Sequence, residues 1–154
     1  MPDIRTPAPH AVHLHDFLRP DHWDVADLWV ANWGAEMPQM GFDARHEWLF
    51  EHLEDLHEKG GRTICAVNLV NGVIAGFVTL DPDGRRLERI VVAASARGSG
   101  VGAKLLDEAK RASPQGLIAE VEPGAARALR FFEREGFERR GQGASGATRL
   151  VWRG

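Results

Sequence analysis

Residues 90–110, "IVVAASARGSGVGAKLLDEAK", constrain the fold of this chain more than any other stretch. An apolar run typical of a strand leads into Gly98, Gly100 and Gly102, and an amphipathic helical pattern follows. Glycine is costly in ordered chain because it loses more conformational freedom on folding than any other residue. Three glycines at the start of a helix therefore indicate that a ligand approaches the backbone there.

The chemistry of a helix start favours an anionic ligand at this loop. The first turn of a helix has unpaired N–H groups and the positive end of the macrodipole. Glycines let a phosphate approach those N–H groups closely, and Arg97 adds a permanent cation whose fork suits phosphate oxygens. The segment "RGSGVG" is therefore predicted to cradle a pyrophosphate, with a flexible surface turn as the alternative.

Two known phosphate-binding patterns compete for the same glycines. A Walker A loop is excluded because no Gly-Lys-Ser/Thr ends the run. The dinucleotide pattern G-x-G-x-x-A is matched by Gly98, Gly100 and Ala103, and Glu120 or Glu122 follows about 20 residues later. However, residues 93–97 separate the strand from the first glycine, and the upstream hairpin pattern favours antiparallel pairing. An NAD-binding oxidoreductase is therefore the less favoured reading.

Hydrophobic periodicity and turn signals predict the order β-α-α-β-β-β-α-β-α-β-β. Asp21 or Asp24 is expected to cap the first helix and Asp43 the second, while Asn71-Gly72 predicts a tight hairpin. The fold class is α/β (α+β), a mixed, mostly antiparallel sheet flanked by about four helices. The predicted strands are 11–18, 62–70, 73–81, 85–93, 116–122, 137–141 and 147–154, with helices up to about residue 32, from Asp43 to Gly60, up to about Arg111, and over 125–136.

Length and composition predict one domain of ordinary size. The 154 residues suffice for a core without disulfides, and three prolines among residues 1–10 indicate a flexible tail before a single domain over residues 11–154. The lone Cys65 lies in an apolar run, so it is expected to be a small core residue in a reduced, cytoplasmic compartment. Neither a signal peptide nor a membrane span is expected.

The charge distribution argues against nucleic acid as a partner. The net charge is −3, which does not suit general nucleic-acid binding. Residues 1–60 hold 12 Asp and Glu against 4 Lys and Arg, whereas residues 61–154 hold 10 against 15. This asymmetry either reflects a solvated surface alone or separates a basic half that meets an anion from an acidic half that meets a cation.

Two motifs resemble the GNAT superfamily of N-acetyltransferases. The glycine segment is similar to the family's acetyl-CoA-binding motif R/Q-x-x-G-x-G/A, which Arg97, Gly100 and Gly102 fill. Residues 121–137, "VEPGAARALRFFEREGF", resemble the family's later strand and helix. The resemblance implies a GNAT-like fold and transfer of an acetyl group from acetyl-CoA to a primary amine of a small molecule or peptide.

The resemblance also implies which residues meet the cofactor. In the family, the strand before the glycine loop splays from the next strand, and the pantetheine arm enters the gap. An N–H near Val92 would then polarise the thioester carbonyl. The implied cofactor-binding residues are Ile90, Val91, Val92, Arg97, Gly98, Ser99, Gly100, Val101, Gly102, Arg127 and Phe132.

Glu88 is the candidate general base on the cofactor strand. A primary amine resembling that of Lys has a pKa near ~10.4, so a base must remove a proton before attack. Strand periodicity predicts that Glu88 shares a face with Ile90 and Val92. The alternatives are that Glu88 forms a cross-strand ion pair with an arginine, or that Glu120 or Glu122 is the base.

One departure from the family pattern concerns the leaving thiolate. Family members often carry a tyrosine where Phe132 stands, whose hydroxyl protonates the sulfur, and this chain has no tyrosine. Ser99 and Ser145 are weak substitutes, and water or unassisted departure are alternatives. The departure keeps open a second function, a non-catalytic module that binds acyl-CoA as a sensor.

The region that would wall the acceptor site is rich in tryptophan. Trp33, Glu36 and Met37 are the predicted substrate-binding residues, and dimerisation, common in the family, stays open. No metal site is expected, because no cysteine or carboxylate in the sequence pattern completes a set with the N-terminal histidines, His10, His13 and His15. His46, His52 and His57 are expected at the surface.

Overall fold

A computed structural model describes residues 11–32, 41–143 and 146–154, and it confirms the predicted order of elements. The strands are β1 (Val12–Asp16), β2 (Arg62–Asn68), β3 (Ile74–Leu80), β4 (Leu87–Val92), β5 (Leu117–Val121), β6 (Glu138–Gln142) and β7 (Thr148–Trp152). The helices are α1 (His22–Ala31), α2 (Phe42–Glu58), α3 (Val101–Ala112) and α4 (Ala126–Arg134), with the short 3-10 turns η1 (Arg19–Asp21) and η2 (Ala94–Ala96). The mixed fold with two antiparallel sheets and four helices matches the predicted class.

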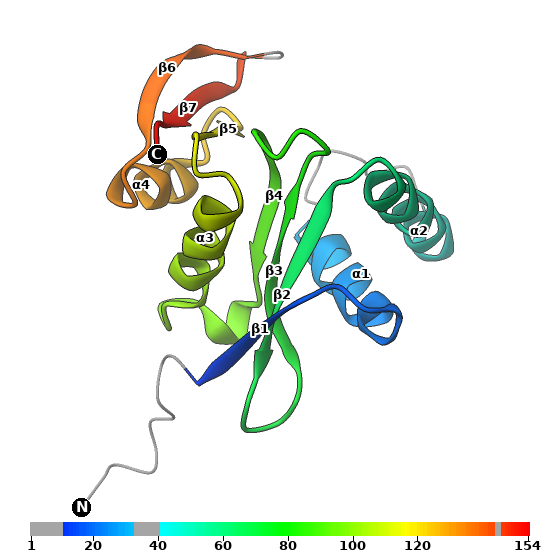
Figure 1. The fold of residues 1–154 in the computed structure, drawn as a ribbon. Helices are drawn as coiled ribbons and strands as arrows, with labels where there is room; N and C mark the ends of the chain where they lie inside the picture. Colours follow the sequence, from blue (N-terminus) through cyan, green and yellow to red (C-terminus); the bar gives the residue numbers. More distant parts are fainter. Residues whose placement is uncertain (1–10, 33–40, 144–145) are drawn as a thin grey trace, which may run out of the picture.

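The larger sheet has the order β1-β2-β3-β4, and each neighbouring pair is antiparallel. Helices α1 and α2 cover one face of this sheet and α3 covers the other (Figure 1). Every residue of the central strand β3 is buried, as expected for a strand that is covered on both faces.

The apolar core is divided by the larger sheet into two clusters. The first contains Leu105 and Leu106 of α3 together with Val78 of β3, and it continues through the smaller sheet to Phe132 of α4. The second contains Trp29 of α1 and Leu49 of α2, packed on the opposite face. Strand alternation therefore sends adjacent residues of β2, β3 and β4 into different clusters.

The smaller sheet has the order β5-β7-β6 and lies beside α4 (Figure 1). In the described part of the chain, backbone pairing joins it to the larger sheet where Arg86 and Ile118 form a parallel bridge and the Ile118 N–H donates to the Arg85 carbonyl at 2.7 Å. Beyond this bridge β4 and β5 belong to different sheets. The strand before the glycine loop thus diverges from the next strand, as the family resemblance implies.

Three local predictions from the sequence were wrong in detail. The hairpin turn is longer than the two residues Asn71-Gly72, because the Asn68 N–H donates to the Val73 carbonyl at 2.8 Å and the strands end at Asn68 and Ile74. Helix α2 is capped by Gly41, and Asp43 lies in its first turn. Asp21 is the N-cap residue of α1, as expected, but its side chain makes no cap hydrogen bond.

None of the helices in the described ranges combines the length and the apolar character that crossing a membrane requires. The tail 1–10 and residues 33–40 and 144–145, which include Trp33, Glu36, Met37 and Ser145, lie outside the described residues.

Candidate functional site

The glycine loop turns the chain from β4 into α3. Gly98 and Gly100 have φ angles of 78° and 88°, in the left-handed region that favours glycine, and Gly100 is the N-cap of α3. A Cβ atom on Gly98 would meet nothing within 4 Å, so space as well as backbone conformation is available beside the loop. The loop that leads into α3 therefore has open space beside Gly98, and helix N-termini are places where backbone amides bind anions.

Gly102 has a different role from the other two loop glycines. A Cβ atom at Gly102 would lie 3.3 Å from carbon atoms of the Phe131 ring and 3.4 Å from Val92 Cγ2. The lack of a side chain therefore lets the first turn of α3 pack closely on α4 and β4. The sequence did not predict this contact of Phe131 with the glycine loop.

Phe132 is a core residue. Its side chain is 4% exposed, and its ring lies 5.2 Å from that of Phe137, centroid to centroid. The side chains of Arg97 and Arg127, by contrast, are exposed and free to reach an anion in solvent. Cofactor contacts of Arg97, Arg127 and Phe132 remain predictions.

The open edge of β4 carries main-chain groups suited to a ligand. The N–H of Ala93, the residue after β4, donates to the Ala75 carbonyl at 2.8 Å and therefore points toward β3. Successive peptide groups of a strand point to opposite edges. The N–H groups of Val92 and Ile90 therefore point away from β3, toward the side on which β4 and β5 have separated.

Glu88 occupies an irregularity of β4. Thr79 is paired with Arg89 and the next residue, Leu80, is paired with Leu87, so Glu88 is the extra residue of a β-bulge. The bulge places Glu88 against α2, where its Oε1 atom lies 2.6 Å from His52 Nε2. Ile90 and Val92 pack on the opposite cluster, beside α3. The expectation that Glu88 shares their face is wrong, because the bulge interrupts strict alternation.

His52 is the partner of Glu88, in place of the arginine considered from sequence. Its ring stacks on Trp48 with a centroid separation of 4.8 Å and an interplanar angle of 7°. Trp29 meets the same ring edge-on at 5.6 Å, and the Arg89 guanidinium lies 4.9 Å from the Trp29 ring centroid. Glu88 and His52 thus form a half-buried acid–imidazole pair with aromatic walls.

The expectation that the histidines of α2 lie at the surface was wrong for His46, which is buried, whereas His52 and His57 are half-buried. His46 is 3% exposed and lies 3.0 Å from Asp27, and His57 bonds the Thr63 hydroxyl at 2.9 Å. The contact of His52 with Trp48 could have been predicted from the sequence, because residues four apart lie on the same face of a helix.

The competing acids, Glu120 and Glu122, have different surroundings from Glu88. Glu120 pairs with Arg86 at 3.1 Å and Arg149 at 3.7 Å, and Glu122 is exposed. The Ser99 hydroxyl, a candidate proton donor, already donates its hydrogen bond to the Ala96 carbonyl. Of these groups, Glu88 combines a half-buried carboxylate with a position on the strand that leads to the glycine loop.

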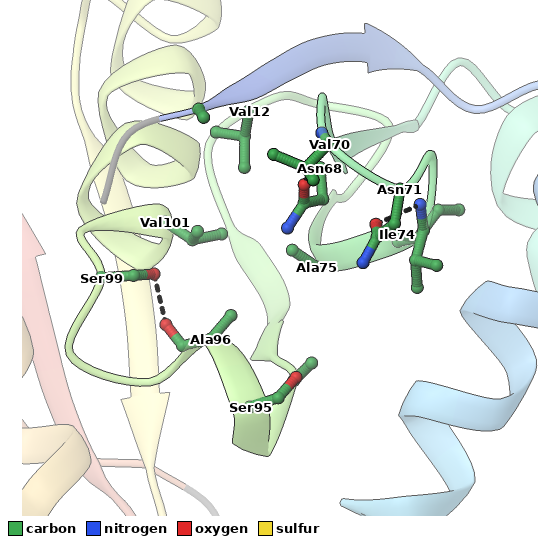
Figure 2. Close-up of a pocket in the computed structure, with 13 residues that line it drawn as sticks. Val12, Asn68, Val70, Asn71, Ile74, Ala75, Ser95, Ala96, Ser99 and Val101 are labelled. Carbon is green, nitrogen blue, oxygen red and sulfur yellow. Dashed lines mark hydrogen bonds between the residues drawn. The ribbon is translucent and has the colours of Figure 1, made fainter. Parts of the chain in front are cut away.

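A small cavity lies on the other side of the glycine loop. It encloses about 170 Å³. Figure 2 shows Ser95, Ala96 and Ser99 on one side of it and Asn68 and Asn71, from the hairpin between β2 and β3, on the other. Ligand pockets typically enclose about 300–1,000 Å³. This cavity is too small for a nucleotide and does not include Glu88, so the open edge of β4 is the more suitable binding surface.

The comparisons with known proteins agree on one family. The model of the acetyltransferase (GNAT) family matches residues 17–137. No curated protein matches the chain significantly. Antiparallel pairing from β1 to β4 also excludes the doubly wound parallel sheet that the NAD-binding alternative requires.

Several solved structures share the fold. A GNAT-family acetyltransferase from Staphylococcus aureus Mu50 aligns with a TM-score of 0.72 at 17% identity, over 93% of this chain and 99% of its own. The PaiA N-acetyltransferase of Thermoplasma acidophilum, solved with coenzyme A, has a TM-score of 0.73 at 13% identity, with 93% and 99% covered. A phosphinothricin acetyltransferase from Sinorhizobium meliloti, solved with AcCoA, has a TM-score of 0.75 at 17% identity, with 93% and 88% covered.

The family model spans both the glycine loop and the bulged strand that leads to it. The chain therefore belongs to the GNAT family of acetyltransferases.

Proposed function

We propose that this protein is an N-acetyltransferase that moves the acetyl group of acetyl-CoA to a primary amine of a small molecule or peptide. The observation that carries the proposal is the divergence of β4 from β5 directly before a glycine loop that opens α3. Structural neighbours solved with coenzyme A or AcCoA support the choice of acyl donor. A cytoplasmic setting is part of the proposal.

The residues present fit a diphosphate and a pantetheine arm. Amides from Gly98 to Gly102 would hold the diphosphate, with Arg97 and Arg127 as exposed cations nearby. The outward N–H groups of Ile90 and Val92 would bond the arm as an added strand does. Acetyl-CoA supplies the acetyl group as a thioester, and the Val92 N–H is suited to polarise its carbonyl.

Glu88 is proposed as the group that accepts the proton of the amine. An ammonium of pKa near ~10.4 cannot attack until it loses a proton. The carboxylate is held in place by His52, whose ring in turn packs against Trp29 and Trp48. The pair offers both a negative charge that attracts an ammonium and a second group that receives the proton.

A specific observation favours a second candidate, an acyl-CoA-binding module without turnover. The chain has no tyrosine, and the Ser99 hydroxyl is bonded to the Ala96 carbonyl, so neither a tyrosine nor Ser99 is placed to protonate a thiolate.

For the transferase, we propose that the thiolate of coenzyme A departs unassisted or takes a proton from water, since a coenzyme A thiol is acidic enough for this.

Two measurements test these proposals. Ligands that bind only the folded state raise its stability by about 2.7 kcal/mol at a concentration of 100 Kd. Acetyl-CoA is expected to raise the melting temperature and NAD is not; stabilisation by NAD alone would overturn the choice of cofactor. Release of free thiol is then followed across a panel of polyamines, aromatic amines and peptide N-termini. Binding without thiol release from any amine would select the sensor module.

A further inference from the structure

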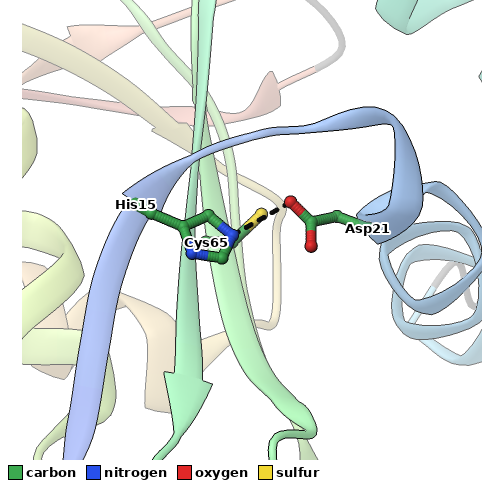
Figure 3. Close-up of side chains that lie close together, drawn as sticks. All are labelled: His15, Asp21 and Cys65. Atoms are coloured by element: carbon green, nitrogen blue, oxygen red, sulfur yellow. Dashed lines mark hydrogen bonds and ion pairs between the residues drawn. The ribbon is translucent and has the colours of Figure 1, made fainter.

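Three side chains of metal-binding chemistry converge at the start of the fold. His15 of β1, Asp21 of η1 and Cys65 of β2 place one ligand atom each within 4.8 Å of one another. His15 and Cys65 are register partners across the β1–β2 pair, so they project from the same face of the sheet. Figure 3 shows the Asp21 carboxylate reaching toward both from the turn that precedes α1.

We propose that His15, Asp21 and Cys65 bind a divalent transition metal of the zinc type. Zinc is held by imidazole, thiolate and carboxylate at about 2.0–2.3 Å, which places the ligands of a tetrahedral site about 3–4 Å apart. His15 Nε2 and Asp21 Oδ2 already lie 3.0 Å apart. Only a small movement would bring the three atoms onto one ion, with the fourth position left to water.

The surroundings hold the ligands in place. The Leu18 N–H donates at 2.8 Å to Asp21 Oδ2, the same oxygen that faces His15 Nε2, and this bond orients the carboxylate toward the site. The Cys65 side chain is fully buried, whereas those of His15 and Asp21 are 27% and 14% exposed, respectively. The two exposed ligands therefore give an ion a path from solvent to the sulfur.

The thiol itself needs a cation to ionise. Burial, together with the smaller effects of the Asp21 and Asp16 carboxylates, raises the pKa of the Cys65 thiol to about 12. Binding a metal would release the thiol proton and balance the buried thiolate with the charge of the ion. The bound metal would tie β1 and β2 to the start of α1, a function separate from acyl transfer.

Cobalt binding to the full chain, first stripped with a chelator, tests the site. Cys65 is the only cysteine, so a thiolate-to-cobalt charge-transfer band can arise from no other residue. One equivalent of Co²⁺ is expected to produce this band, and Zn²⁺ is expected to remove it by displacement. Absence of the band at millimolar Co²⁺, or binding without it, would overturn the proposal.

Variants separate a three-ligand site from binding by the thiol alone. His15→Ala and Asp21→Asn are each expected to weaken cobalt binding at least tenfold, because loss of even an outer-shell partner costs about 10–100-fold. His13→Ala is the matched control on the same strand and is expected to keep the wild-type affinity. An unchanged affinity in both His15→Ala and Asp21→Asn would overturn the site. Circular dichroism confirms that each variant is folded.

Discussion

The β-bulge in β4 determines the surroundings of Glu88. The bulge directs its carboxylate to His52 at 2.6 Å, on the face covered by α1 and α2, while Ile90 and Val92 pack beside α3. Bulges often re-aim a side chain next to an active site. The acid and the open edge of β4 therefore belong to one strand although their side chains project to different faces.

Replacing Glu88 tests its role as base. Glu88→Gln keeps the size of the side chain and removes proton acceptance, so kcat at neutral pH is expected to fall by about 10²–10⁴-fold. The dissociation constant of acetyl-CoA, measured by calorimetry, is expected to stay within about twofold of the wild-type value. Glu51→Gln, on the exposed side of α2, is the control and is expected to keep the wild-type rate.

A full rate in Glu88→Gln would remove Glu88 as the base. Loss of rate in Glu120→Gln or Glu122→Gln, with Glu88→Gln unaffected, would transfer the role to the smaller sheet.

Cys65 is expected to be chemically inert in the native protein. Its buried thiol has a pKa raised to about 12, and the thiolate is the reactive form. Because a raised pKa lowers the fraction of thiolate at neutral pH, native protein is expected to react with a thiol reagent at least about 100-fold more slowly than urea-unfolded protein. Rapid stoichiometric labelling of the native chain would contradict this burial. The same inertness means that a thiol assay of turnover reads released coenzyme A.

At the scale of elements, the sequence predicted what depends on local pattern. The strand, glycine loop and helix of residues 90–110 follow from apolar periodicity and glycine spacing, and the structure confirms them as β4 and α3. The bulge at Glu88 leaves no local signal, because it arises from pairing with β3. The pairing of His52 with Glu88, 36 residues away, and the approach of Cys65 to His15 and Asp21 were missed because each contact joins residues that are distant in sequence.

Close packing of β3 against β4 gives a prediction at this scale. A Cβ atom at Gly76 would lie 2.6 Å from the Val91 carbonyl oxygen, so Gly76→Ala must push the two strands apart. We expect a loss of about 1–3 kcal/mol in the free energy of unfolding, measured with urea, and weaker acetyl-CoA binding. Gly41→Ala, where a Cβ would meet nothing within 4 Å, lacks this clash, so it is expected to cost no more than the roughly 0.5–1 kcal/mol of a poorer N-cap residue. Equal stability of the two variants would contradict the strand packing.

At the scale of the whole molecule, two histidines link stability to pH. Burial lowers the pKa of His57 and of His22 below the ordinary value of 6.5. The unfolded chain therefore takes up protons more readily than the folded one as pH falls below about 6.5, and the folded state loses stability. The loss continues until the pH reaches the folded-state pKa values, below which both states are protonated at these sites.

Melting temperatures between pH 8 and pH 5 check this linkage. The melting temperature is expected to fall on the acidic side of about pH 6.5, because each lowered histidine pKa adds to the slope. His57→Gln, which removes one of the two groups, is expected to flatten the curve. A slope identical to that of the wild type would show that His57 does not contribute.

The central claim is that the backbone amides of residues 98–102 bind the diphosphate of acetyl-CoA while the thioester lies along β4. A crystal structure of the complex tests it most directly. We predict diphosphate oxygens within hydrogen-bond distance of these amides, about 2.7–3.2 Å from nitrogen, and the acetyl carbonyl near the Val92 N–H. A complex with the diphosphate bound elsewhere, or with β4 and β5 closed against each other, would contradict the account.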